Sequence, residues 1–97
     1  MPEKKTIERA RRDQREGKAP TTQAGEFVRE EIEHVKEGKH GVKNPRQAIA
    51  IALSKARRAG VAVPPPAPGK AKERTRRQAK RDLEKGKQEG PLRKKAA

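Results

Sequence analysis

Ten of the fourteen large apolar side chains of this 97-residue chain (Val, Ile, Leu, Met and Phe) lie within residues 27–63. Charged residues make up 41% of the chain and hydrophobic residues only 29%, with one phenylalanine and no tyrosine or tryptophan. The remaining segments are too polar to recover by burial the entropy that they would lose on ordering. We therefore expect one small folded unit in the middle of the chain, flanked by basic arms that are partly disordered.

The first half of the apolar stretch has the periodicity of an amphipathic helix over residues 23–37. Thr21 or Thr22 is suited to cap the start of this helix, and Gly38 to end it. Its apolar side chains recur at positions i, i+4 and i+7 and share one face, formed by Val28, Ile32 and Val35.

The second half carries the clearest helix signals of the chain. Asn44 as N-cap, Pro45 at the first helical position and Gly60 after the last indicate a helix over residues 45–59. Its apolar stripe consists of Ile49, Ala52, Leu53 and Ala56. We expect the two stripes to pack together, so that residues 21–63 form an all-α helical hairpin. Two valines should fold back over its open end, Val61 and Val63.

The segments around the hairpin lack a comparable apolar face. The N-terminal arm, residues 1–20, has the pattern of a short, solvated helix over 7–16. Three consecutive prolines make residues 64–69 an extended spacer. The C-terminal arm, residues 70–97, is compatible with a nascent basic helix over 71–85 and a disordered tail.

The formal net charge of +14 points to a polyanionic partner. Residues 64–97 hold twelve basic and four acidic groups, so they are the main candidate for phosphate contacts, the alternative being a solubilising tail. The cations of this arm are Lys70, Lys72, Arg74, Arg76, Arg77, Lys80, Arg81, Lys85 and Lys87. Duplex DNA is the favoured partner and RNA the alternative, because the chain lacks the aromatic side chains on which single-stranded bases stack.

The outward face of the helix over 45–59 carries residue types that can contact base edges in a groove. They are Gln47, Ser54 and Arg58, with Lys55 at the edge of this face, and Arg57 in the last turn is a further candidate for nucleic-acid binding. An ordinary solvated face is the preferred interpretation, because the connector of residues 38–43 is longer than a helix-turn-helix turn. A third interpretation is a homodimer contact, since Ile51 lies on the same face.

Motifs for catalysis or metal binding are weak. Glu31 and His34 satisfy Glu-x-x-His, a pattern of di-iron helical bundles, but the helix over 45–59 has no acidic residue to complete such a site. His40 is expected to be a solvated loop residue. There is no cysteine, glycine-rich phosphate loop or nucleophile motif. The sequence therefore predicts no metal, no cofactor and no enzymatic activity.

Two segments of the chain resemble a family of small basic bacterial proteins, largely uncharacterised, some of which carry the label plasmid stabilisation protein. They read AGEFVREEIEHVKEGKHG and QAIAIALSKARRAG, and the opening KKTIERARRDQREGK and the later VPPP are similar as well. The resemblance implies a bacterial origin, a helical hairpin and an association with DNA or its maintenance.

Three hypotheses follow for the function. The first is a sequence-tolerant DNA-binding protein of the bacterial cytoplasm, associated with the nucleoid or a plasmid, whose basic arms contact phosphates. The second is a structural or assembly protein of a ribonucleoprotein or phage particle. The third is an adaptor whose hairpin binds a protein partner while its tails keep it soluble. A membrane role is not expected, because the longest apolar run, residues 48–53, is too short to span a bilayer.

Overall fold

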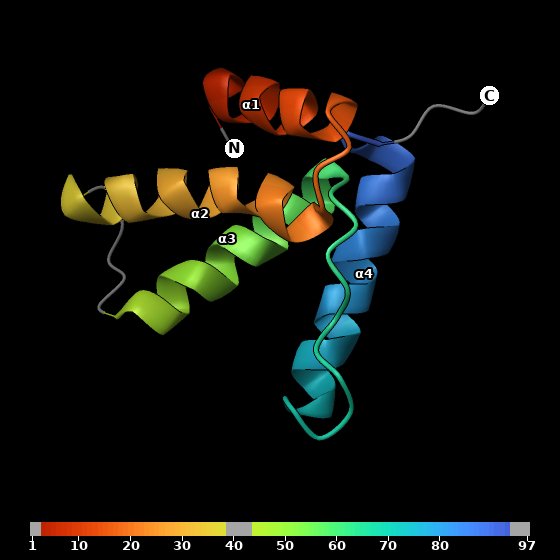
Figure 1. The fold of residues 1–97 in the computed structure, drawn as a ribbon. Coiled ribbons are helices and arrows are strands. Elements are labelled where there is room, and N and C mark those ends of the chain that lie inside the picture. The colour runs from red at the N-terminus through yellow and green to blue at the C-terminus, as the bar shows by residue number, and fades with distance from the viewer. Residues whose placement is uncertain (1–2, 39–43, 94–97) are drawn as a thin grey trace.

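The computed structural model describes residues 3–38 and 44–93. Within these ranges the protein consists of four helices and no β-strand: α1 (Lys4–Arg15), α2 (Pro20–Lys36), α3 (Pro45–Ala59) and α4 (Glu73–Glu89). As Figure 1 shows, α2 lies between α1 and α3, and α4 crosses the C-terminal end of α3. The predicted all-α class is therefore confirmed for the described part of the chain.

Helix α3 has the bounds that its sequence predicts. The Asn44 side chain accepts a hydrogen bond from the backbone N–H of Gln47 at 2.8 Å, and Pro45 occupies the first helical position. Gly60 ends the helix with a φ of 108°, in the left-handed region that glycine adopts without strain. The bounds of α3 are therefore determined by local sequence signals alone.

The two preceding helices begin earlier than predicted. Helix α2 starts at Pro20 rather than at residue 23, because proline suits the first helical position, where its missing N–H costs nothing. Helix α1 starts at Lys4 rather than at residue 7. Thr21 and Thr22 consequently lie inside α2 and do not cap it, and Thr6 lies inside α1, where it is only 2% exposed.

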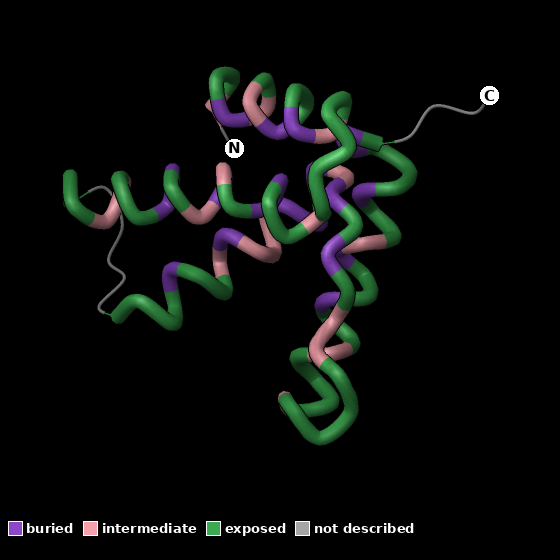
Figure 2. Tube along the Cα trace, viewed as in Figure 1, coloured by how far each residue is buried: buried purple, intermediate pink, exposed green. Residues whose placement is uncertain are grey.

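Small side chains dominate the core. Its buried members are Ala10, Ala24, Phe27, Ala52, Ala56, Ala59, Val61, Val63 and Leu92. Figure 2 shows these buried positions on the inner sides of the helices and along the segment that follows α3. The predicted folding back of Val61 and Val63 is thus confirmed. The hairpin stripes are only partly right, because alanines occupy the helix contact while Ile32 and Ile49 remain 39% and 41% exposed at its edge.

The described part of the C-terminal arm, up to residue 93, contains a helix packed on α3 rather than a nascent helix with a disordered continuation, and residues 94–97 of the predicted tail lie outside the described residues. Gly86, which directly follows the predicted helix over 71–85, lies inside α4 at the contact with α3. A Cβ atom on Gly86 would overlap the carbonyl oxygen of Arg57, and one on Gly90 would overlap the backbone of Ala59. These two glycines therefore let the backbones of α3 and α4 touch.

Leu92 completes the core from beyond the end of α4. It is 1% exposed, and its backbone N–H donates to the carbonyl of Ala59 at 2.8 Å. Its own carbonyl accepts a hydrogen bond from the Gln14 side chain of α1 at 3.1 Å. Both predicted arms are thus joined to the hairpin, and α1, which also packs along α2, is not a solvated helix.

Replacing Gly86 by alanine tests the α3–α4 contact. We expect Gly86→Ala to lower the free energy of unfolding by about 1–3 kcal/mol, because the added methyl group must push the two backbones apart. The control is Gly25→Ala on α2, where a Cβ meets nothing within 4 Å and alanine should stabilise the helix by up to about 1 kcal/mol. Equal stability of the two variants in urea unfolding would contradict the contact.

Two carboxyl groups meet at the contact between α1 and α2. Asp13 of α1 is 6% exposed, and the side chain of Glu26 of α2 is 14% exposed. Burial raises the pKa of Glu26 above its ordinary value of 4.5, and the hydrogen bond with Asp13 raises this pKa further. The folded state therefore favours the protonated form of Glu26, so its contribution to stability is present at acidic pH and is lost as the pH rises.

We accordingly expect Glu26→Gln to raise the unfolding temperature at pH 7 by about 2–5 °C, since the amide does not have to be buried as a charge. The gain should disappear below about pH 4, where Glu26 is protonated in both the folded and unfolded chain. Thermal unfolding from pH 3.5 to 7.5 measures this, with exposed Glu33→Gln as control. A gain that grows toward acidic pH would refute the assignment.

Candidate nucleic-acid interface

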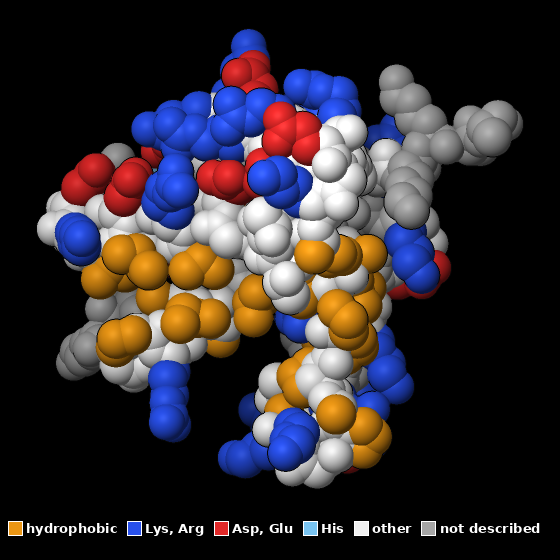
Figure 3. Space-filling model, in the orientation of Figure 1, with side chains coloured by type: hydrophobic (Ala, Val, Ile, Leu, Met, Phe, Trp, Pro, Cys, Tyr) orange, Lys and Arg blue, Asp and Glu red, His pale blue; other side chains and the backbone are white. Residues whose placement is uncertain are grey.

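Helix α4 presents one face to α3 and a basic face to solvent. Its buried residues are Ala79, Asp82 and Gly86. The cations of the opposite face are exposed, and none forms an ion pair with a described residue: Arg74, Arg77, Lys80, Arg81, Lys85 and Lys87. Lys70 and Lys72 are exposed just before the helix. Eight of the nine predicted arm cations are thus on the surface, and Figure 3 shows blue side chains around the lower part of this region.

The ninth arm cation, Arg76, contacts the proline segment instead. Its Nε donates to the carbonyl of Pro66 at 2.9 Å, and its Nη1 lies 2.7 Å from a carboxylate oxygen of Glu73. The Arg76 side chain is 15% exposed. It therefore holds the start of α4 against the segment that leads into it.

Arg57, predicted as a nucleic-acid ligand, also holds the proline segment. Its guanidinium donates to the carbonyls of Val63 at 3.1 Å and Pro64 at 2.8 Å. Consecutive prolines have no N–H groups, so this segment cannot form a regular ladder of backbone hydrogen bonds. Its carbonyls need other donors, and Arg57 supplies them for Val63 and Pro64. Burial lowers the pKa of Arg57, and the nearby charge of Asp82 partly offsets this effect. The segment expected to be a free spacer is extended but is bound to both flanking helices.

Asp82 links two of the α3 candidates, Ser54 and Arg58, to α4. This carboxylate is 3% exposed and accepts hydrogen bonds from Ser54 at 2.8 Å and from Gln78 at 3.0 Å. The Nε of Arg58 lies 3.5 Å from it. Ser54 is therefore turned toward α4, whereas the Arg58 side chain is still 55% exposed.

The other two α3 candidates lie in different surroundings. Lys55 forms a 2.9 Å ion pair with Glu31 of α2, whose side chain is fully buried. Gln47 is exposed near the start of α3. The structure thus does not bring the α3 candidates together as one free surface, and Ile51 beside them is half-buried.

Cations of the two termini meet in a hollow of about 610 Å³. Lys18, which follows α1, lines it together with Lys87 and Arg93 from the C-terminal end, and no acidic residue lines it. Sequence reasoning does not single out Lys18 or Arg93, because the pairing of these termini depends on the burial of Leu92. The hollow is a concave, cationic surface of the kind that suits a phosphate group.

Helix α1 adds a second basic surface that the predicted residue set omits. Its exposed cations are Lys4, Lys5, Arg11, Arg12 and Arg15, with Glu8 and Glu16 among them. Arg11 also donates a hydrogen bond to the carbonyl of Pro91 at 3.1 Å, next to the hollow. The alternation of Lys and Arg with small buried residues in this helix is the sequence signal that could have placed these side chains outward.

Comparison with known proteins assigns the chain to a family but not to an activity. Residues 3–67 match the family of unknown function DUF6496, and the chain belongs to this family. The match covers α1 to α3 and ends within the proline segment, before α4. No curated protein and no solved structure matches the sequence. Among the described residues, none of the helices has the length and apolar character needed to cross a membrane.

The adjacent arginines Arg57 and Arg58 should differ sharply in their effect on stability. Arg57→Lys should cost about 1–2 kcal/mol of unfolding free energy, because an ammonium group cannot reproduce the forked donors to Val63 and Pro64. Arg58→Lys should change stability by less than about 0.5 kcal/mol, as expected for an exposed ion pair. Denaturant unfolding of both variants decides the matter, and equal costs would show that Arg57 does not hold the segment.

Proposed function

We propose that this member of the DUF6496 family binds duplex nucleic acid, DNA in preference to RNA, through phosphate contacts and with little dependence on base sequence. The observation that carries the proposal is the outer face of α4, where six exposed cations lie that form no ion pair with a described residue. The basic surface of α1 and the cationic hollow between the termini extend it. In a bacterial cell this activity would place the protein at the nucleoid or on a plasmid.

The dimensions of α4 suit a DNA groove. The exposed cations run from Arg74 to Lys87, which at the rise of an α-helix is about 20 Å, the axial length of about six nucleotides of one strand. A helix with its side chains is about 10–12 Å wide, close to the width of the major groove. Cations on the flanks of α4 can then reach phosphates on both sides of the groove.

Burial of acidic groups strengthens the positive surface potential. Asp13, Glu30, Glu31 and Asp82 are buried, whereas Arg57 is the one buried cation among the described residues. The surface is therefore more basic than the composition indicates. Low sequence preference is expected because Ser54, Lys55 and Arg57 make contacts within the protein, which leaves few polar side chains for base edges.

An apolar strip favours a protein partner as the second candidate. Ile32 and Ile49 are exposed and Val28 and Leu53 only partly buried, and Figure 3 shows hydrophobic side chains along the neighbouring edges of α2 and α3. An adaptor, a second copy of the chain or a component of a ribonucleoprotein or phage particle could cover this strip. Such binding would not depend on salt as phosphate contacts do.

Neutralising part of the α4 face tests the proposal. We expect Arg74→Gln, Arg77→Gln and Arg81→Gln together to weaken binding to every duplex alike. If about six phosphate contacts form in the wild type, the slope of log K against log salt should change from about −5 to about −2.5. Fluorescence anisotropy with two unrelated duplexes at 50–300 mM salt measures both effects. Substitutions are preferable to truncation, because removing α4 would also remove Leu92 from the core.

The matched control removes three exposed cations elsewhere: Arg29→Gln, Lys36→Gln and Arg46→Gln. This variant has the same net charge as the α4 triple variant, so only the position of the lost charges differs. The proposal predicts a slope close to that of the wild type for the control. If both triple variants lost the same affinity for DNA, binding would depend on net charge alone and not on the α4 face. Unchanged affinity of the α4 variant would overturn the proposal.

A further inference from the structure

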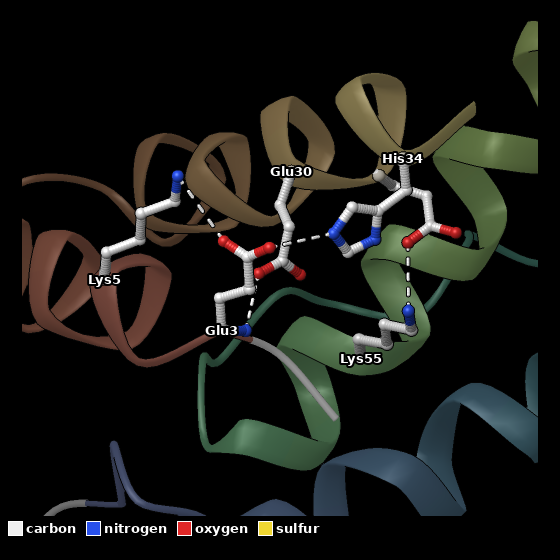
Figure 4. A network of polar contacts seen from close by, with 6 residues as sticks. Glu3, Lys5, Glu30, His34 and Lys55 are labelled. Carbon is white, nitrogen blue, oxygen red and sulfur yellow. Dashed lines mark hydrogen bonds and ion pairs between the residues drawn. The ribbon is translucent and has the colours of Figure 1, made fainter. Parts of the chain in front are cut away.

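Three side chains that the proposed function does not use converge where the start of α1 meets the middle of α2. Glu3 precedes α1, while Glu30 and His34 lie one turn apart on the same face of α2 (Figure 4). One potential ligand atom from each of the three lies within 4.8 Å of the other two. The cluster combines one imidazole and two carboxylates, which are both ligand types that zinc accepts.

The distances within the cluster are close to those of a metal site. The Nε2 of His34 is 3.1 Å from a carboxylate oxygen of Glu3, and the backbone N–H of Glu3 donates to Glu30 at 2.6 Å. Tetrahedral zinc ligands with bonds of about 2.1 Å lie about 3.4 Å from one another. Only small side-chain rotations are therefore needed to place all three ligands around one ion.

Glu30 gives an independent reason to expect a cation. It is 3% exposed, and its Oε2 atom is buried without a hydrogen-bond donor among the described residues. A buried carboxylate oxygen that has lost its water and gained no donor is energetically costly. A bound metal ion would coordinate this oxygen, to which no other group of the cluster donates a hydrogen bond.

We propose that Glu3, Glu30 and His34 bind a divalent transition-metal ion of the zinc type. The imidazole favours such an ion over Ca²⁺ or Mg²⁺, which prefer oxygen ligands. The side chain of Glu3 is 38% exposed, so ions can enter from solvent and a water molecule can occupy a fourth position. Glu31, half of the predicted Glu-x-x-His pair, instead forms an ion pair with Lys55.

One cation of the described residues forms an ion pair with the cluster and would compete with the metal. Lys5 lies 3.5 Å from the second carboxylate oxygen of Glu3, and its side chain is 58% exposed, so it can turn into solvent. Coordination replaces the hydrogen bond between His34 and Glu3: Nε2 binds the ion through its lone pair, and the neutral imidazole carries its proton on Nδ1. A bound ion would tie the residue before α1 to the middle of α2 and so stabilise the docking of α1.

Calorimetric titration of the metal-free, full-length protein with ZnCl₂ tests the site. We expect one Zn²⁺ per chain with a Kd in the micromolar range or below, and an unfolding temperature about 5 °C or more higher at a hundredfold excess over Kd. CaCl₂ should produce neither effect. The absence of saturable Zn²⁺ binding, or a stoichiometry unrelated to the number of chains, would overturn the proposal.

Variants locate the binding. His34→Asn and Glu30→Gln should each weaken Zn²⁺ binding at least tenfold, whereas Glu33→Gln on the same helix should bind as the wild type does. His40→Asn controls for the other histidine, which lies outside the described residues. Circular dichroism checks that each variant is folded, and if buried Glu30→Gln unfolds, half-buried His34→Asn decides. Wild-type affinity in His34→Asn, or loss of binding in His40→Asn, would refute the site.

Discussion

The close contact between α3 and α4 is the interaction on which the rest of the structure depends. The chain has few large apolar side chains, so its helices bury surface through close backbone approach rather than through the packing of large side chains. Gly86 and Gly90 make this approach feasible, because any side chain at either position would overlap the backbone of α3. The same contact carries Leu92 into the core, where it reaches α1 and α3.

Docking of α4 on α3 also determines which face of α4 exposes its cations. A basic segment in free solution would present its cations on all sides, but α4 turns Ala79, Asp82 and Gly86 inward and its cations outward. Two buried carboxylates join the helices: Asp82 between α3 and α4, and Glu31, paired with Lys55, between α2 and α3. One arrangement therefore both holds the helices together and leaves a basic surface.

The sequence predicts the helix that local signals determine, but it does not predict the helix contact that depends on tertiary packing. The bounds of α3 follow from Asn44, Pro45 and Gly60, which act on neighbouring residues only. The docking of α4 could not be derived in the same way, because its apolar residues are sparse and glycine at 86 is ordinarily a helix end. The spacing Gly86-x-x-x-Gly90 places two small residues on one helix face, and this was the available clue to a close helix contact.

The residues of the candidate sites also differ in whether their roles could be predicted from the sequence. Outward cations on α4 follow from composition and from helical geometry. The internal roles of Arg57 and Ser54 do not, because they depend on where the proline segment and Asp82 lie after folding. The cluster of Glu3 with Glu30 and His34 joins residues about thirty positions apart, and only the α2 pair, with i,i+4 spacing, was visible in the sequence.

Amide hydrogen exchange of the free protein tests the central claim, that α4 is a stably docked helix rather than a flexible basic tail. Protection is set by the free energy of opening each segment, so a helix docked through Gly86 and Leu92 should exchange with the core. The account predicts that amides of residues 79–89 are protected to nearly the same degree as those of residues 52–59. Exchange of residues 79–89 at the rate of an unstructured peptide, with α2 and α3 still protected, would contradict it.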